Sequence, residues 1–314
     1  MDSIQQSMLR ITGYSDKFSA RPGEEITFFV HSEQNESFQA DIVRLIHGDT
    51  NPDGPGYKEE LIHPPISDMH PGVNQPVYAG SYVLVPHNKV FDVASFTICA
   101  YIYPTTPTVD NEGVAVGVQG VLTKWDASNE TGYGLFINES GELCLRIGRG
   151  KDKVEECSTG KPLMRKVWYK VGASYDANTG KVRVFQIPYV TNTNGGHGMS
   201  MLHPLEDTLG EKEFSTHYGV PTNNDCPLLL AASTEKTNSG RTIFGAHYKD
   251  LSEPLTIPVN TQKYNGKIER PKLVNCALNK HDIEILLSSQ GIENVPNEQR
   301  KKVIGAWDFV ANIK

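Results

Sequence analysis

The residues that could do chemistry in this sequence are few, and they form no complete catalytic set. His47 and Asp49 are spaced as a base and its orienting carboxylate could be, but no nucleophile or third orienting group lies near them. The sequence has no Gly-x-Ser-x-Gly elbow, no P-loop, no GxGxxG and no HxH or HExxH pair. We therefore predict no catalytic residue and no metal ligand in this chain.

The carboxylates are likewise not paired for acid–base work. A glycosidase built on a β-sandwich uses acids a few residues apart on one strand face, as in Glu-x-Asp-x-x-Glu. Residues 267–270 (KIER) offer only the single acid Glu269. A calcium site needs several acidic oxygens that converge, and Asp126 and Glu130 are too sparse to provide them.

The loop from His47 to Glu60, HGDTNPDGPGYKEE, is the most unusual segment of the sequence. Its Gly and Pro residues exclude regular structure, and its prolines lower the entropy cost of holding one shape. Two interpretations stay open: a rigid connection packed on the neighbouring domain, or a contact loop for another domain or subunit. We expect Asx turns in this loop, and Tyr57 buried against residues beyond about 75 or against another chain. The predicted contact residues are His47, Asp49, Asn51, Asp53 and Tyr57.

Alternation of apolar and polar residues, the pattern of half-buried strands, recurs along most of the sequence. Together with 28 Gly and 19 Pro residues it predicts an all-β protein. Residues 1–72 are expected to form a small immunoglobulin-like β-domain with its linker. Residues 73–314 are expected to form a jelly-roll β-sandwich with one short helix near the C-terminus.

Residues 168–186, WYKVGASYDANTGKVRVFQ, show the clearest strand pattern. Two alternating runs flank a turn in which Asp176, Asn178 and Gly180 supply turn chemistry, with Gly180 free to adopt positive φ. This pattern predicts a β-hairpin. Because a lone hairpin is only marginally stable, the hairpin must lie on a larger sheet.

One helix and one long loop complete the expected elements. Residues 279–287 are predicted to be helical, with Asn279 as N-cap and an apolar face of Ile283, Leu286 and Leu287. Residues 188–226 have mixed composition and no clear period, which predicts an irregular loop.

The net charge and the cysteines restrict the partners and the compartment. A formal charge of -7 and a pI near 5.8 give no electrostatic footprint for nucleic acid. No apolar run approaches the roughly 20 residues that span a bilayer, and no signal peptide is visible. The five cysteines are odd in number and form no CxxC pair, so we expect reduced thiols and a cytoplasmic protein.

Three aromatic residues could face a ligand. Sugar-binding modules stack sugar rings on exposed aromatic side chains beside polar hydrogen-bonding groups. Trp125, Tyr133 and Tyr218 are the candidates for such a role, and burial in the core is the other interpretation of each.

Several segments together carry a family resemblance. GSYVLVPHNKVFDVASFTICAYIYP, GVLTKW, GYGLFINESGELCLRIG and WYKVGASYDANTGKVRVFQ follow the order seen in laminin-G-like, concanavalin A-like sandwiches. FQADIVRLIHGDTNPDGPGYKEE, GRTIFGAHYKDLSEP, NGKIERPKLVNCAL and GAWDF closely resemble the N-terminal part of the large (beta) subunit of N,N-dimethylformamidase. This second resemblance covers nearly the whole chain.

The resemblance implies hydrolysis of N-substituted formamides at a non-haem iron held by Tyr, Glu and His in a later, catalytic part of the subunit. No position of this chain corresponds to those ligands, so it implies no cofactor here and leaves open whether the chain is an enzyme. It implies a non-catalytic role in scaffolding, assembly or ligand binding, with the catalytic domain and the small subunit as partners. The alternative is a free-standing lectin-like carbohydrate-binding module. A catalytic continuation downstream of Lys314 in the coding DNA would separate the two.

Overall fold

The computed structural model describes residues 10–32, 35–62, 69–74, 81–189, 205–216, 219–243, 255–289 and 292–309. The chain divides into two compact units, Met1–Ala79 (unit 1) and Gly80–Lys314 (unit 2). The sequence-based boundary, between residues 72 and 73, lies slightly before this division.

The described part of unit 1 contains two separate antiparallel ladders. Strand β1 (Ile11–Ser15) pairs with β2 (Phe28–Ser32), and β3 (Val43–His47) pairs with β4 (Lys58–Leu61). Each sheet has only two strands. The expected β-structure is present, and the immunoglobulin-like arrangement of its strands stays a prediction.

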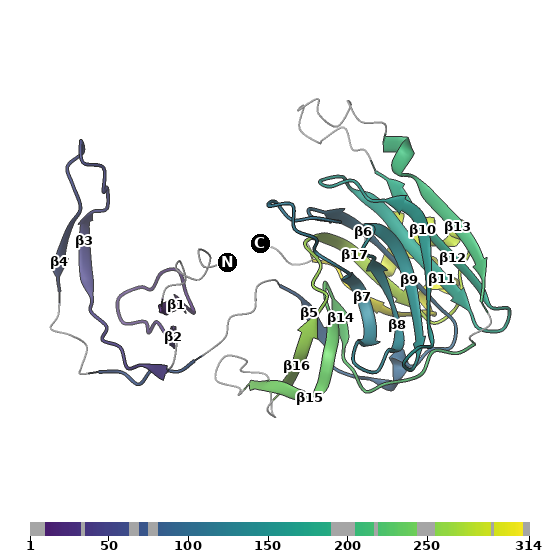
Figure 1. Cartoon of the computed structure of the whole chain (residues 1–314), viewed down its shortest axis with the longest axis horizontal. Helices are drawn as coiled ribbons and strands as arrows, with labels where there is room; N and C mark the ends of the chain where they lie inside the picture. The colour runs from purple at the N-terminus through teal and green to yellow at the C-terminus, as the bar shows by residue number, and fades with distance from the viewer. Residues whose placement is uncertain are drawn as a thin grey trace. The chain divides into compact units, whose positions relative to one another are not determined.

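Unit 2 is a two-sheet β-sandwich, which confirms the predicted all-β fold (Figure 1). The larger sheet has the order β10-β9-β8-β7-β14-β5, with β15 joined to β7 and β16 joined to β15. Its strands are β5 (Val83–Val85), β7 (Gln119–Asp126), β8 (Thr131–Ile137), β9 (Glu142–Arg149), β10 (Val154–Pro162), β14 (Leu228–Leu230), β15 (Ser233–Ile243) and β16 (Leu255–Thr261).

The second sheet of unit 2 has the order β13-β12-β11-β6-β17-β18. Its strands are β6 (Phe96–Pro104), β11 (Tyr169–Asp176), β12 (Lys181–Pro188), β13 (Gly210–Ser215), β17 (Gly266–Val274) and β18 (Val303–Ala306). The predicted hairpin is β11 and β12, paired from Tyr169↔Pro188 to Asp176↔Lys181. Gly180 has φ 68° at its turn, as its type predicts.

Strand β13 corrects the expectation of an irregular loop over residues 188–226. Residues 210–215 form the edge strand of the second sheet, paired with β12. The strand is hard to read from sequence because Glu211, Lys212 and Glu213 are all exposed, as is common on edge strands. Residues 190–204, with His197 and His203, lie outside the described residues.

The main core lies between the two sheets. Alternate residues of β8 and β9 face the same core as alternate residues of β6 and β11, which is the period of strands with one buried face. The fully buried members include Leu135, Ile137, Leu143, Phe96, Ile98, Val171 and Ala173.

Helix α1 (Lys280–Ser288) covers the other face of the second sheet and confirms the predicted helix. Asn279 is its N-cap, because its side chain accepts a hydrogen bond from the Asp282 backbone N–H at 2.9 Å. The apolar face of α1 packs with Cys99 and Phe185 in a second core. The other helical segments among the described residues include η3 (Lys89–Phe91), η5 (Leu205–Thr208), η6 (Ile292–Asn294) and α2 (Asn297–Arg300). None of the helices described has the length and apolar character to cross a membrane.

Candidate functional site

The predicted contact loop is the tip of the β3–β4 hairpin, and its own side chains hold its shape. The Nδ1 atom of His47 lies 3.3 Å from the Asp49 backbone N–H nitrogen and 3.1 Å from the Gly56 carbonyl oxygen. One ring thus contacts both ends of the loop. Asp49 Oδ1 accepts from Asn51 N at 2.8 Å, and Asn51 Oδ1 accepts from Asp53 N at 3.1 Å. These are the Asx turns expected at Asp49 and Asn51.

These contacts give the polar residues of the loop a conformational role. The Asp49 carboxylate binds backbone two residues along the chain, where it closes a turn. The same holds for the Asn51 amide oxygen. Nothing in this geometry brings a base, an orienting acid and a nucleophile together.

Tyr57 lies at the end of the loop and is 54 % exposed. Its hydroxyl donates to Glu59 Oε2 at 2.6 Å, and this hydrogen bond raises the pKa of Tyr57. Nothing in the described part of unit 1 covers this side chain, and its expected burial against residues beyond about 75 or against another chain stays a prediction. The contact role of the loop stays a prediction about surfaces outside unit 1.

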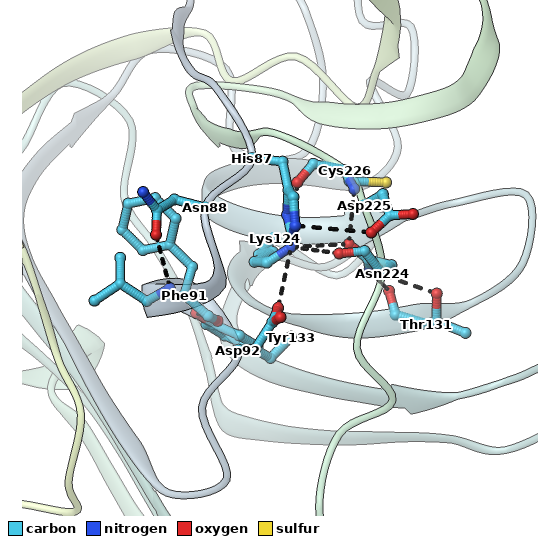
Figure 2. Close-up of polar contacts among 11 residues, drawn as sticks. His87, Asn88, Phe91, Asp92, Lys124, Thr131, Tyr133, Asn224, Asp225 and Cys226 are labelled. Carbon is cyan, nitrogen blue, oxygen red and sulfur yellow. Dashed lines mark hydrogen bonds and ion pairs between the residues drawn. The ribbon is translucent and has the colours of Figure 1, made fainter.

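Lys124 of β7 is the centre of a buried polar network that the sequence analysis did not single out (Figure 2). Its side chain is 2 % exposed, and its Nζ donates to the carbonyl oxygens of Asn224 at 2.6 Å and Cys226 at 3.2 Å. The Nζ also lies 3.2 Å from His87 Nδ1 and 3.6 Å from Asp92 Oδ1. One ammonium group therefore joins β7, residues 87–92 and the segment that leads into β14.

The surroundings of Lys124 define a structural role. Burial lowers the pKa of Lys124, and the Asp92 carboxylate opposes this effect. At 3.6 Å the Asp92 contact is an ion pair and is too long for a hydrogen bond. An ammonium group has three N–H donors, and four closer acceptors surround them: the Asn224 and Cys226 carbonyl oxygens, Asn224 Oδ1 and His87 Nδ1. Lys124 is therefore a fixed charge that holds two segments against the sandwich.

Strand period could have revealed this lysine. Leu122 and Lys124 are two residues apart in VLTKWD and so share a face of β7. Leu122 pairs with Leu135, and Lys124 pairs with Tyr133, so both positions lie on the core face. A lysine in phase with core residues signals a buried charge with partners.

Trp125 and Tyr133 are buried, 3 % and 2 % exposed, so of the two interpretations that the sequence left open for these candidates the structure agrees with burial. The Trp125 ring packs edge-on against Phe136 with centroids 5.8 Å apart, and it lies so close to Gly148 that a Cβ there would come within 2.6 Å of it. The Tyr133 hydroxyl donates to a backbone carbonyl at 2.8 Å. Tyr133 belongs to the main core, and Trp125 belongs to a smaller apolar cluster with Phe136 and Cys144. Tyr218 lies outside the described residues.

A groove of about 380 Å³ lies on the face of the larger sheet that points away from the main core. Across it Arg146 Nε donates to Glu156 Oε2 at 2.7 Å. Because Trp125 is almost fully buried, the groove offers hydrogen-bonding groups without an exposed ring face for a sugar. Its lining is Trp125, Ala127, Glu130, Arg146, Asp152, Val154, Glu156 and Gln262.

Within the part of the chain that the structure describes, no group of three or more His, Cys, Asp or Glu side chains is placed to hold a metal ion. The described residues thus do not provide the iron site that the resemblance implies for a later part of the subunit.

All five cysteines are free, and burial raises the pKa of the thiols of Cys99, Cys157 and Cys226 to about 12. Thiolate is the reactive form, so buried thiols should react slowly. We expect only the half-buried Cys276 to react with a disulfide reagent at pH 8 in the native protein. Under denaturing, non-reducing conditions we expect all five thiols; a titration that finds three or fewer would contradict reduced cysteines.

Comparison with models of known protein families shows to which class the sandwich of unit 2 belongs. Residues 78–186 match the family model described as the concanavalin A-like lectin/glucanases superfamily. Unit 2 therefore contains a concanavalin A-like domain, as the sequence resemblance predicted.

Two longer relatives resemble nearly the whole chain. Over 309 residues, 97 % of its length, the chain is 31 % identical to the N,N-dimethylformamidase beta subunit of Paracoccus aminophilus. Over 308 residues, also 97 %, it is 29 % identical to the N,N-dimethylformamidase beta subunit of an Alcaligenes species. Each match covers 36 % of the relative, so the chain spans about a third of the length of these relatives. The predicted resemblance is confirmed.

Among solved structures, the IT-sialidase CBM40 of Ruminococcus gnavus bound to α2,3-sialyllactose is similar to 66 % of this chain and 97 % of its own. The identity is 12 % and the TM-score 0.40. A likeness at this level supports no inference about ligands.

Proposed function

We propose that this chain is a non-catalytic, N-terminal β-region of a cytoplasmic N,N-dimethylformamidase-like large subunit and that it serves to assemble the enzyme. The observation that carries this proposal is the match along 97 % of the chain to only 36 % of each relative. The relatives thus have the greater part of their length outside the matched region. The proposal assigns the hydrolysis of the formamide to that part.

Two features of the chain suit an assembly role. The sandwich of unit 2 has a continuous core and a helix packed on one sheet, so it offers a rigid body for other domains to contact. Unit 1 presents a hairpin whose tip is shaped by its own hydrogen bonds, so little entropy is lost when it contacts a partner. The proposed partners are the catalytic part of the large subunit and the small subunit.

The test uses co-expression. We expect the 314-residue chain to form a stable complex with the part of the Paracoccus aminophilus beta subunit that the match leaves out, seen by size-exclusion chromatography with light scattering. We expect the chain alone, with ferrous iron and N,N-dimethylformamide, to release no dimethylamine above an iron-only blank. Turnover by the chain alone, or no complex on co-expression, would contradict the proposal.

The carbohydrate-binding alternative is less well supported by the geometry. Two of the three aromatic residues named for it, Trp125 and Tyr133, are buried. It therefore depends on Tyr218, which lies outside the described residues, and we do not advance it as a second function.

A further inference from the structure

Two lysines are buried among the residues that the structure describes, and their surroundings differ. Lys124 is 2 % exposed and Lys272 of β17 is 3 % exposed. Carbonyl and imidazole acceptors surround the ammonium group of Lys124. The ammonium group of Lys272 forms no hydrogen bond and no ion pair with any described residue. A buried charge without a partner is unfavourable, so Lys272 lacks the structural explanation that Lys124 has.

The tip of the Lys272 side chain is open to a ligand. Fully enclosed polar side-chain atoms without a hydrogen-bond partner include Thr106 Oγ1 among the described residues, but Lys272 Nζ is not one of them. The stem of this lysine is therefore buried while its nitrogen reaches the surface. Burial lowers the pKa of Lys272, because desolvation disfavours the charged form. An anion that reached the nitrogen would supply the missing partner.

Strand register places Lys272 on the face of the second sheet that points away from the main core. Lys272 pairs with Cys99 of β6, and Cys99 packs with the apolar face of α1 on that side. Tyr101 lies two residues further along β6 and packs against the same cluster. Lys272 and Tyr101 therefore share the face that α1 covers in part.

A β-bulge brings Arg270 to the same place. The pairing of β17 with β6 shifts between Glu269 and Lys272, so two residues of β17, Arg270 among them, lie opposite one residue of β6. Arg270 has φ 49°, a left-handed conformation that residues other than glycine rarely adopt. Bulges re-aim side chains and are frequent next to functional sites. Burial raises the pKa of Tyr101 and lowers that of Lys272, and the nearby guanidinium group of Arg270 acts on both.

The hydrogen-bond donors of this face exceed the acceptors that the described residues provide. Arg270 Nε lies 3.5 Å from Glu269 Oε1, which leaves the other guanidinium nitrogens without a described partner. The Tyr101 hydroxyl likewise forms no hydrogen bond with a described residue. The carboxylates of Asp308 and Glu269 oppose the lowering of the Lys272 pKa, but neither forms an ion pair with Lys272.

We infer that Lys272, Arg270 and Tyr101 bind a carboxylate group on this face of the second sheet. A carboxylate can accept from an ammonium, a guanidinium and a phenol at once, and its charge relieves the repulsion between the two cations. The negative charges of Glu269 and Asp308 favour a singly charged anion over a phosphate dianion. The carboxylate belongs either to a small free anion such as formate or acetate, or to an Asp or Glu side chain of an assembly partner.

A titration with small anions tests the site in the 314-residue chain. Sodium formate and sodium acetate are the probes, with sodium chloride at equal ionic strength and sodium phosphate as comparisons. At about ten times the half-saturating concentration, a carboxylate should raise the Tm by about 3 °C over chloride, because it binds only the folded state. Phosphate should raise the Tm by less.

Four variants identify the residues of the site. Arg270→Gly should fold as before, because glycine adopts φ 49° without strain, and should raise the half-saturating concentration about tenfold or more. Lys272→Met removes a buried charge without a partner, so it should bind about tenfold more weakly with no loss of Tm in chloride. Tyr101→Phe keeps the ring that packs edge-on against Tyr189 and should weaken binding about threefold. Lys267→Met, at an exposed lysine of the same strand, is the matched control and should bind within about twofold of the wild type.

A second experiment decides the source of the carboxylate. The part of the Paracoccus aminophilus beta subunit that the match leaves out is co-expressed with the wild type, with Arg270→Gly and with Lys267→Met. Capture that weakens about tenfold in Arg270→Gly alone assigns the carboxylate to a side chain of that partner. Equal capture by all three, together with binding of formate or acetate, assigns it to a free anion.

Two results would overturn the inference. The first is equal stabilisation by formate, acetate and chloride together with capture that Arg270→Gly leaves unchanged. The second is a carboxylate effect that persists undiminished in both Arg270→Gly and Lys272→Met, which would make it an unspecific salt effect. Failure of the wild type to capture the partner would contradict the proposed function; the anion titration then decides the site alone, and equal stabilisation by carboxylate and chloride would overturn it.

Discussion

Replacing Lys124 with methionine should lower the free energy of unfolding of unit 2 by roughly 3 kcal/mol. Methionine has a similar length, so the substitution removes the charge and its hydrogen bonds with little change in volume. The carbonyl oxygens of Asn224 and Cys226 would lose their donor, and Asp92 would lose its counter-charge. Chemical denaturation monitored by tryptophan fluorescence measures the loss.

A matched control keeps this prediction specific. Lys181 lies on β12 and is exposed, so Lys181→Met should change the stability by less than about 0.5 kcal/mol. If the two variants lose the same stability, the buried network does not hold the segment before β14.

The pH dependence of stability provides a second readout for Lys124. Burial lowers the pKa of Lys124 in the folded protein from its ordinary 10.5. Between the folded pKa and 10.5 the unfolded state binds more protons, so this group makes the wild type more stable as pH rises through that window. The stability difference between wild type and Lys124→Met should therefore grow from pH 7 towards pH 10. A constant difference would contradict the lowered pKa.

Replacing Gly132 with alanine should cost roughly 3 kcal/mol of stability. Gly132 has φ +102°, and a Cβ at this position would lie 2.0 Å from the Lys124 carbonyl oxygen and 2.6 Å from Asn224 Nδ2. The first contact is with backbone of the neighbouring strand, which cannot move without disturbing the pairing of β7 and β8. The substitution therefore combines an unfavourable φ with a steric clash.

Gly150→Ala is the control for backbone strain alone. Gly150 has φ +126°, and a Cβ there would meet nothing within 4 Å. It should cost only about 1 kcal/mol. Thermal unfolding of the two variants side by side measures the difference, and equal losses would show that the clash at Gly132 is relieved without cost.

Local patterns in the sequence were sufficient for the elements that depend on near neighbours. The hairpin of β11 and β12 follows from alternation and turn residues, and α1 begins directly after Asn279 because the Asn279 side chain caps its first turn. The quoted motifs also predicted the concanavalin A-like domain and the resemblance to N,N-dimethylformamidase. Each of these signals lies in a short stretch of chain or in a family motif.

The candidate sites depended on contacts between residues far apart in the sequence. Alternation could place Trp125 on one face of its strand, but the packing of Phe136 and Gly148 decided that the ring is buried. The environment of Lys124 depends on carbonyl oxygens about 100 residues further along the chain. Edge strand β13 gave no apolar pattern because both its faces carry exposed charges, and only its pairing with β12 defines it.

In the β3–β4 hairpin, too, some features follow from the local sequence and others only from the tertiary structure. Its sequence determined the turns of the loop, because Asp49 and Asn51 bond to backbone only two residues away. Glu59 and Leu61 share a face because they are two residues apart on β4, but only the register of the two strands decided that Leu45 lies on that face too. A one-residue shift in pairing would have placed Leu45 and Leu61 on opposite faces of the hairpin, so this arrangement could be found only in the folded chain.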